Sequence, residues 1–170
     1  MKRRTKVMKK NQGFSLVELI VVIAIMAVLV GVLAPAYLRY VEKSRKSTDI
    51  SSISDILAAA EKVAIDPQFD LGANSKFILS GQGTLNLTTT EVTSDGDSAA
   101  LAEWKSIAGS QYVCKSKEFK TLNVTFTGTL QANGSVTWTQ SGAADMLSFS
   151  PDFQKKWNFG AAAASAGSSD

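Results

Sequence analysis

The sequence predicts an α+β fold, in which one long N-terminal helix packs on a small antiparallel β-sheet. An apolar run from Phe14 to Leu38 continues without a turn signal into an amphipathic pattern that lasts to Ile65. Further along, segments after residue 110 alternate apolar and threonine-rich positions, as strands with one buried face do. The apolar stripe of the helix and the apolar face of the sheet would each bury the other.

The apolar run is long enough to cross a membrane. Twenty residues from Leu19 to Leu38 contain no ionisable group except Tyr37, and a helix of that length covers about 30 Å. Glu18 is the only charged residue between Phe14 and Leu38. Gly31 and Pro35 are tolerated in such helices, where they mark a weak point or a kink that can melt.

The amphipathic pattern extends the helix to about Ile65. Asp66-Pro67 then predicts its end, because the residue before a proline avoids the helical region. Apolar residues that recur at spacings of three and four make the buried stripe: Ile50, Ile53, Leu57, Ala60 and Ala64.

The remaining elements are predicted from local patterns. Residues 66–98 are expected to form a polar connection with a short strand at 84–90. A helix at 99–108 follows, with Asp97 or Ser98 as its cap. Strands are predicted at 111–116, 121–130 and 135–140, arranged as a meander with a hairpin turn at Asn133-Gly134.

Apolar residues near the C-terminus are expected to cover an edge of the sheet, before a flexible tail at 160–170. They are Met146, Phe149, Phe153, Trp157 and Phe159. The tryptophans Trp104, Trp138 and Trp157 are interpreted as packing residues rather than as ligand platforms.

The composition excludes several classes of function. The 170-residue chain has no histidine and one cysteine, Cys114. Imidazole catalysis, an intramolecular disulfide and a multi-cysteine zinc site are therefore excluded, and Cys114 is expected to be a buried small apolar residue. No nucleophile or nucleotide-binding motif is present, so we expect no enzyme activity, cofactor or metal; only carboxylate-based catalysis is left open.

Glu91, Asp95 and Asp97 are close enough in the sequence to suggest a calcium site. Their spacing matches no EF-hand pattern. A helix cap with solvated neighbours is the preferred interpretation of these acidic residues.

Charge is distributed unevenly along the chain. Six of the 18 basic residues fall in the first ten positions, whereas from Phe14 onward there are 12 basic and 15 acidic residues. A basic cluster in front of an apolar stretch is typical of a membrane-targeting segment. The formal charge of +3 therefore belongs to the N-terminal tip and does not indicate nucleic-acid binding.

A short motif joins the basic cluster to the apolar run. Gly13, Phe14, a small hydroxyl residue, two aliphatic residues and Glu18 follow one another as GFSLVE. In this motif, and in the placing of Pro35, the sequence resembles the type IV prepilin family, which includes the pseudopilins of type II secretion. The resemblance covers about 25 residues and implies that a prepilin peptidase cuts between Gly13 and Phe14 and N-methylates Phe14.

Glu18 is a charged residue inside the predicted membrane span. A carboxylate within an apolar span costs a few kcal/mol on insertion scales, and such residues are functional by default. The resemblance implies that Glu18 pairs with the Phe14 amine of a neighbouring subunit during assembly. Register is a better-attested use of a buried charge pair than net stability, so Glu18 and Phe14 are assigned to subunit assembly as a hypothesis.

The resemblance implies a structural subunit of a type IV pilus, with roles in adhesion, motility or DNA uptake. The runner-up is a pseudopilin of a secretion or competence apparatus. Implied partners are further pilins in a helical homo-oligomer, the prepilin peptidase, an assembly platform and membrane lipid, with nucleic acid only at the level of the filament. The protein is expected in the cytoplasmic (inner) membrane with its N-terminus inside, then in an extracellular pilus.

These implications divide the chain into five segments. They are a basic leader at 1–13, a membrane-spanning and filament-core half of the helix at 14–38, an amphipathic half at 39–66, a head at 67–159 and a tail at 160–170. Many pilins close a C-terminal loop with a disulfide, which a single cysteine cannot form. Apolar residues such as Trp157 and Phe159 are expected to tether this region instead.

Two plainer hypotheses are left open. In the first, the N-terminus is a secretory signal peptide, for which Ala34-Pro35-Ala36 supplies a cleavage signature. In the second, a simple signal anchor holds an exported enzyme or binding module. The length of the span and the acid near its start argue against the former, and the latter leaves the GFSLVE motif unexplained.

Overall fold

Helix α1 runs from Leu16 to Ala64 in the computed structural model, which describes residues 13–69, 71–90 and 97–159. The chain divides into two units, residues 1–40 and 41–170, and α1 contributes to both. The predicted helix from Phe14 to Ile65 is confirmed to within two residues at each end. At its C-terminal end, the N–H of Ile65 still bonds to the carbonyl of Glu61 at 3.3 Å, directly before the predicted stop at Asp66-Pro67.

The first unit contains the apolar part of α1. Every residue from Gly13 to Tyr40 is exposed in the single chain. The most apolar 18-residue window of the helix has a mean hydropathy of 3.1, and by length and composition α1 is the one helix among the described residues that can cross a membrane. This surface therefore needs an apolar environment that the single chain does not supply.

The second unit is built on a five-stranded antiparallel sheet with the order β3-β2-β1-β4-β5. Its strands are β1 (Lys76–Gln82), β2 (Thr84–Thr90), β3 (Gln111–Val113), β4 (Asn123–Leu130) and β5 (Val136–Ser141). The Asn133-Gly134 turn is confirmed, because Gly134 has a φ of +81° and the N–H of Gln131 bonds to the carbonyl of Ser135 at 2.8 Å.

Two predictions about the sheet are wrong. Residues 76–82 were assigned to a polar connection but form the central strand β1, in which Phe77 and Leu79 are buried. The sheet is also not a meander of the later strands, because β3 pairs with β2 and β4 pairs with β1. A strand buried in the centre needs partners on both sides, and β1 obtains them from β2 and β4.

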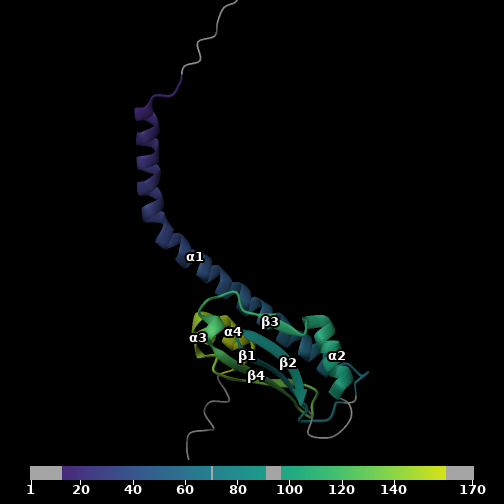
Figure 1. The fold of residues 1–170 in the computed structure, drawn as a ribbon. Coiled ribbons are helices and arrows are strands. Elements are labelled where there is room, and N and C mark those ends of the chain that lie inside the picture. The colour runs from purple at the N-terminus through teal and green to yellow at the C-terminus, as the bar shows by residue number, and fades with distance from the viewer. Residues whose placement is uncertain (1–12, 70, 91–96, 160–170) are drawn as a thin grey trace, which may run out of the picture. The chain divides into compact units, whose positions relative to one another are not determined.

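The second half of α1 packs on the sheet, as the amphipathic pattern predicts. In Figure 1 this part of the helix crosses the sheet, with α2 (Asp97–Ala108) at one side and α3 (Ala144–Phe149) and α4 (Pro151–Lys156) at the other. The stripe residues Ile53, Leu57 and Ala60 have no exposed surface. From the sheet, Val124 and Phe126 of β4 are equally buried.

All three tryptophan indoles donate hydrogen bonds to α1. Trp104 of α2 donates to the carbonyl of Ile56 at 2.9 Å. Trp138 of β5 donates to Glu61 Oε1 at 3.2 Å, and Trp157, which follows α4, donates to Ser54 Oγ at 3.3 Å. The prediction that the tryptophans are packing residues is confirmed, because each is at most 5% exposed.

The C-terminal aromatic residues cover the β4–β5 side of the sheet, as predicted. The rings of Trp157 and Trp138 form an edge-to-face pair with centroids 5.9 Å apart. Phe153 and Phe159 pack against Phe126 with centroids 6.0 and 5.5 Å away. Aromatic contacts therefore tether this region without a disulfide; the predicted tail at 160–170 lies outside the described residues.

Candidate functional site

Gly13, Phe14 and Ser15 lie just before α1 and are not part of it. The Phe14 residue is 92% exposed, and a Cβ added to Gly13 would meet no atom within 4 Å. The Gly13–Phe14 peptide bond is therefore in a non-helical segment, and none of the described residues beyond its neighbours lies against Gly13. The remainder of the predicted leader, residues 1–12, lies outside the described residues.

Glu18 has a partner within its own chain. Its Oε2 atom accepts a hydrogen bond from the backbone N–H of Ser15 at 2.9 Å. Because α1 begins at Leu16, Ser15 is the N-cap and Glu18 is the third helical residue, which is the spacing of a capping box. This role is a finding of the structure, and the S-x-x-E pattern at residues 15–18 is the sequence signal that indicates it.

The helix continues through both residues of the predicted weak point. Proline has no backbone N–H, so Pro35 cannot donate to the carbonyl four residues earlier, which belongs to Gly31. Glycine is also a poor helix former. The two residues thus weaken the same turn of α1; whether that turn kinks or melts stays a prediction.

A buried carboxylate on α1 binds the segment that follows β3. Asp49 has no exposed surface, and its oxygens accept hydrogen bonds from Tyr112 Oη at 2.7 Å, from the N–H of Lys115 at 2.8 Å and from the N–H of Ser116 at 2.8 Å. Burial raises the pKa of Tyr112 to about 12, which keeps its hydroxyl a donor. Asp49 therefore holds β3 and the residues that follow it against α1.

Glu42, two turns earlier on α1, binds the same segment. Its Oε1 atom accepts hydrogen bonds from Ser116 Oγ at 2.6 Å and from the N–H of Lys117 at 2.7 Å. These bonds, that from Ser116 above all, hold the pKa of Glu42 below its ordinary value. Together, Glu42 and Asp49 fix residues 115–118 beside the start of the second unit.

Lys46 lies between these two carboxylates in the sequence and adds an ion pair. Its Nζ atom contacts Glu118 and lies 5.7 and 5.4 Å from the ring centroids of Phe119 and Phe149. Cations over aromatic faces are attracted by the ring quadrupole. This lysine is thus engaged with the head, unlike its exposed basic neighbours.

Cys114 is buried, as predicted, and carries a free thiol. Burial raises its pKa to about 11. The thiol therefore stays protonated at physiological pH, and because the thiolate is the reactive form, the residue is chemically inert in the folded chain.

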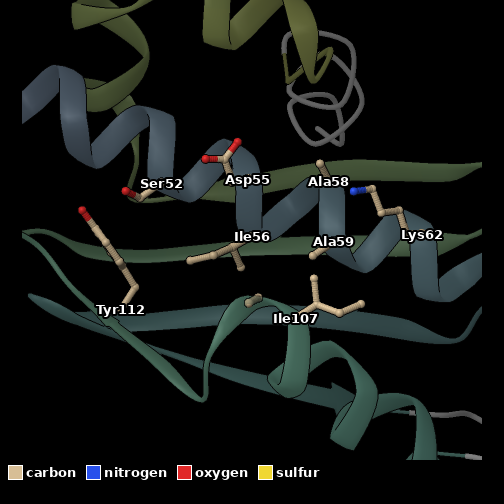
Figure 2. Close-up of a pocket in the computed structure, with 9 residues that line it drawn as sticks. Ser52, Asp55, Ile56, Ala58, Ala59, Lys62, Ile107 and Tyr112 are labelled. Atoms are coloured by element: carbon tan, nitrogen blue, oxygen red, sulfur yellow. The ribbon is translucent and has the colours of Figure 1, made fainter.

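A surface groove separates α1 from α2 and β3. Its volume is about 480 Å³, and Figure 2 shows Tyr112 and Ile107 opposite Ile56 and Ala59 of α1. The charged residues at the groove, Asp55 and Lys62, are exposed. Small-molecule sites have buried polar groups that converge on the ligand, so the groove lacks the features of such a site.

The described residues contain no group of three or more cysteine, histidine or acidic residues that would hold a metal ion. Of the residues weighed for calcium, Glu91 and Asp95 lie outside the described residues. Asp97 is the first residue of α2, two residues before the predicted start.

The N-terminal segment matches a family model. Residues 8–34 fit the prokaryotic N-terminal methylation motif. This match includes the Gly13–Phe14 junction, Glu18 and most of the apolar run. It does not extend to the head.

Similar proteins are fimbrial proteins. A fimbrial protein of Pseudomonas aeruginosa is 28% identical over 96 residues, which cover 49% of this chain and 62% of that protein. Fimbrial protein Q of Moraxella bovis is 34% identical over 86 residues, which cover 49% of this chain and 52% of that protein. Together with the methylation motif, these matches support the resemblance of the chain to the type IV prepilin family.

The chain spans less than two thirds of the length of these relatives, and no solved structure matches it. The comparisons therefore show a methylation motif at the N-terminus and similarity to fimbrial proteins over about half of the chain. A long N-terminal helix whose second half packs on a five-stranded antiparallel sheet is a type IV pilin-like arrangement.

Proposed function

We propose that this chain is a structural subunit of a type IV pilus, held in the cytoplasmic (inner) membrane before assembly and extracellular afterwards. The observation that carries the proposal is the methylation motif at residues 8–34, set directly before an exposed apolar helix. Before assembly, the exposed apolar part of α1 would lie in the lipid of the membrane. In a filament, the corresponding helices of other subunits would replace the lipid.

The basic leader orients the chain. Six basic residues precede the span, and basic segments tend to stay on the cytoplasmic side. A prepilin peptidase then cuts between Gly13 and Phe14. The absence of a side chain at Gly13 supports this step, because a protease can approach an extended glycine backbone closely.

Cleavage creates the chain end that assembly uses. The new amine of Phe14 is N-methylated and remains cationic. It pairs with the carboxylate of Glu18 in a neighbouring subunit, which sets the axial register of helices that otherwise share only apolar contacts. The second oxygen of Glu18 is available for this pair while Oε2 accepts the Ser15 bond.

The turn weakened by Gly31 and Pro35 gives α1 a place to kink or melt as helices pack in the filament. The second half of α1 is supported differently, because three indole hydrogen bonds and a buried stripe fix it to the head. We expect any change in helical structure on assembly to be confined to the first half of α1, at residues 16–38.

Isolation of surface appendages tests this function. Long filaments sheared from cells and containing this chain are the expected result, with an assembly platform and the prepilin peptidase required for their formation. A secretion defect without filaments would instead favour the pseudopilin function. Failure of the chain to assemble with any partner would favour a simple membrane anchor.

A further inference from the structure

Basic residues concentrate near the start of the second unit. Residues 39–49 and 115–120 contain seven of the twelve basic residues that follow Phe14. Outside these two segments, the chain after residue 50 has five basic and eleven acidic residues. The concentration is therefore a local feature of a head that is otherwise acidic.

Each acidic residue of the two segments has a partner, although the Glu118 side chain is 65% exposed. Asp49 is fully buried, Glu42 accepts bonds from the segment after β3, and Glu118 contacts Lys46. Of the exposed cations in these segments, the five that belong to the second unit form a group that we call the basic collar: Lys43, Arg45, Lys115, Lys117 and Lys120.

The two carboxylates of α1 bring the parts of the collar together. The N–H of Lys115 bonds to Asp49, and the N–H of Lys117 bonds to Glu42. Glu42 also lies 3.8 Å from Arg45. The exposed lysines after β3 are thus held next to the exposed cations of α1, and the local surface carries an excess of positive charge.

The first residue of the collar comes soon after the apolar run in the sequence. Lys43 is five residues after Leu38 on α1, which is about 8 Å of helical rise. Headgroup regions extend roughly 5–8 Å beyond the hydrocarbon core. Tyr37 and Tyr40, both exposed, lie in the same stretch, and tyrosine is enriched at the membrane–water interface. Tyrosines followed by cations are typical of an interfacial anchor.

We propose that the basic collar binds the phosphates of anionic phospholipids on the membrane face where the head emerges. This inference rests on the proposed function, since it requires the membrane-held stage. Basic clusters next to a span are attracted to anionic lipid surfaces over distances of a Debye length. The contact orients the head before assembly, and extraction into a filament breaks it.

Lysine labelling tests this binding in the full chain. The chain is placed in nanodiscs of phosphatidylglycerol or of phosphatidylcholine, and acetylation rates are measured by mass spectrometry. Lys115, Lys117 and Lys120 should react at least threefold more slowly in phosphatidylglycerol, and 0.5 M NaCl should remove the difference. Lys62 and Lys76, exposed elsewhere on the second unit, should react equally in both lipids.

Matched variants separate the collar from net charge. In the triple variant Lys115→Gln, Lys117→Gln and Lys120→Gln, the lipid-dependent protection of Lys43 should be lost. In the triple variant Lys62→Gln, Lys76→Gln and Lys105→Gln, which removes the same charge, the protection of Lys43 should persist.

Three results would overturn the proposal. One is equal labelling of the collar in both lipids when the helix has inserted in both, which leaves the pilin function intact. Another is protection that rises with chain concentration in phosphatidylcholine, or only with added DNA, since the collar would then serve a second copy or a nucleic acid. Failure of the helix to insert in either lipid would count against the membrane stage itself.

Discussion

The carboxylate of Glu18 and the backbone N–H of Ser15 are joined by a hydrogen bond of 2.9 Å. The residue proposed to pair with a neighbouring chain end therefore also caps the start of its own helix. The two roles are separable, because glutamine serves in a capping box as glutamate does but carries no charge.

Glu18→Gln is expected to keep the helix start and to lose assembly. We expect hydrogen exchange in the first turns of α1 to change less than twofold, whereas filament yield falls more than tenfold, as in Glu18→Ala. Shear fractions and exchange mass spectrometry measure the two effects. Normal filaments from Glu18→Gln, with poor filaments from Glu18→Ala, would assign the residue to capping alone.

Gly13→Val is expected to slow leader removal more than tenfold without a change in the head. An added Cβ meets nothing within 4 Å among the described residues, so a loss reports on the approach of the protease. Membrane fractions should then contain a species heavier by the leader. Gly31→Ala, whose Cβ is equally free of contacts, serves as the control; equal processing of both variants would refute the assignment of Gly13.

Asp49→Asn should destabilise the head by about 2–4 kcal/mol, because an amide nitrogen replaces one acceptor of buried N–H and hydroxyl donors. Urea unfolding followed by tryptophan fluorescence measures the loss, since all three tryptophans lie in the head. Asp55 is the next carboxylate along α1 and is exposed. As the control, Asp55→Asn should change the free energy of unfolding by less than about 0.5 kcal/mol. Similar values for both variants would contradict the role given to Asp49.

Ser116→Ala should raise the pKa of Glu42 toward its ordinary value of 4.5, because the main hydrogen bond to the carboxylate is lost. The folded state has the lower pKa, so this contribution to stability is present above about pH 4.5. It is lost as the pH falls through the folded-state pKa. Carboxyl NMR titration measures the shift, and Glu42→Gln should flatten the decline in stability below pH 4.5. An unchanged profile in Glu42→Gln would be contrary to this account.

Trp157→Ala should cost about 3–5 kcal/mol, the usual range for removal of a buried tryptophan. The variant loses the edge-to-face contact with Trp138 and the hydrogen bond to Ser54. Trp157→Phe keeps an aromatic ring and should cost less. Equal stability of the wild type and Trp157→Ala in urea unfolding would show that aromatic contacts do not tether the C-terminal region.

Strong periodicity allowed much of the fold to be predicted. The long helix and β2 lie where the sequence indicates, because their apolar positions repeat at helical and strand spacing. Strand β1 was missed even though Phe77 and Leu79 alternate with other residues. Its glycine-bearing surroundings favoured a loop, and the central place of β1 depends on pairing with β4, which is more than forty residues away in the sequence.

Only the part of the candidate site that lies within a local sequence motif could be predicted. The GFSLVE segment indicated Gly13, Phe14 and Glu18 directly. By contrast, the hydrogen bonds that Asp49 and Glu42 accept from residues 115–118 join segments more than sixty residues apart. No local pattern indicates such contacts, because they follow from the packing of α1 on the sheet.

The mature N-terminus tests the central claim most directly. The intact mass and terminal sequence of the chain, purified from the membrane and from surface fractions, are to be measured by mass spectrometry. We predict a first residue of N-methylated Phe14 in both fractions. A chain that still begins at Met1, or one that begins at Tyr37 after cleavage at Ala34-Pro35-Ala36, would contradict the account.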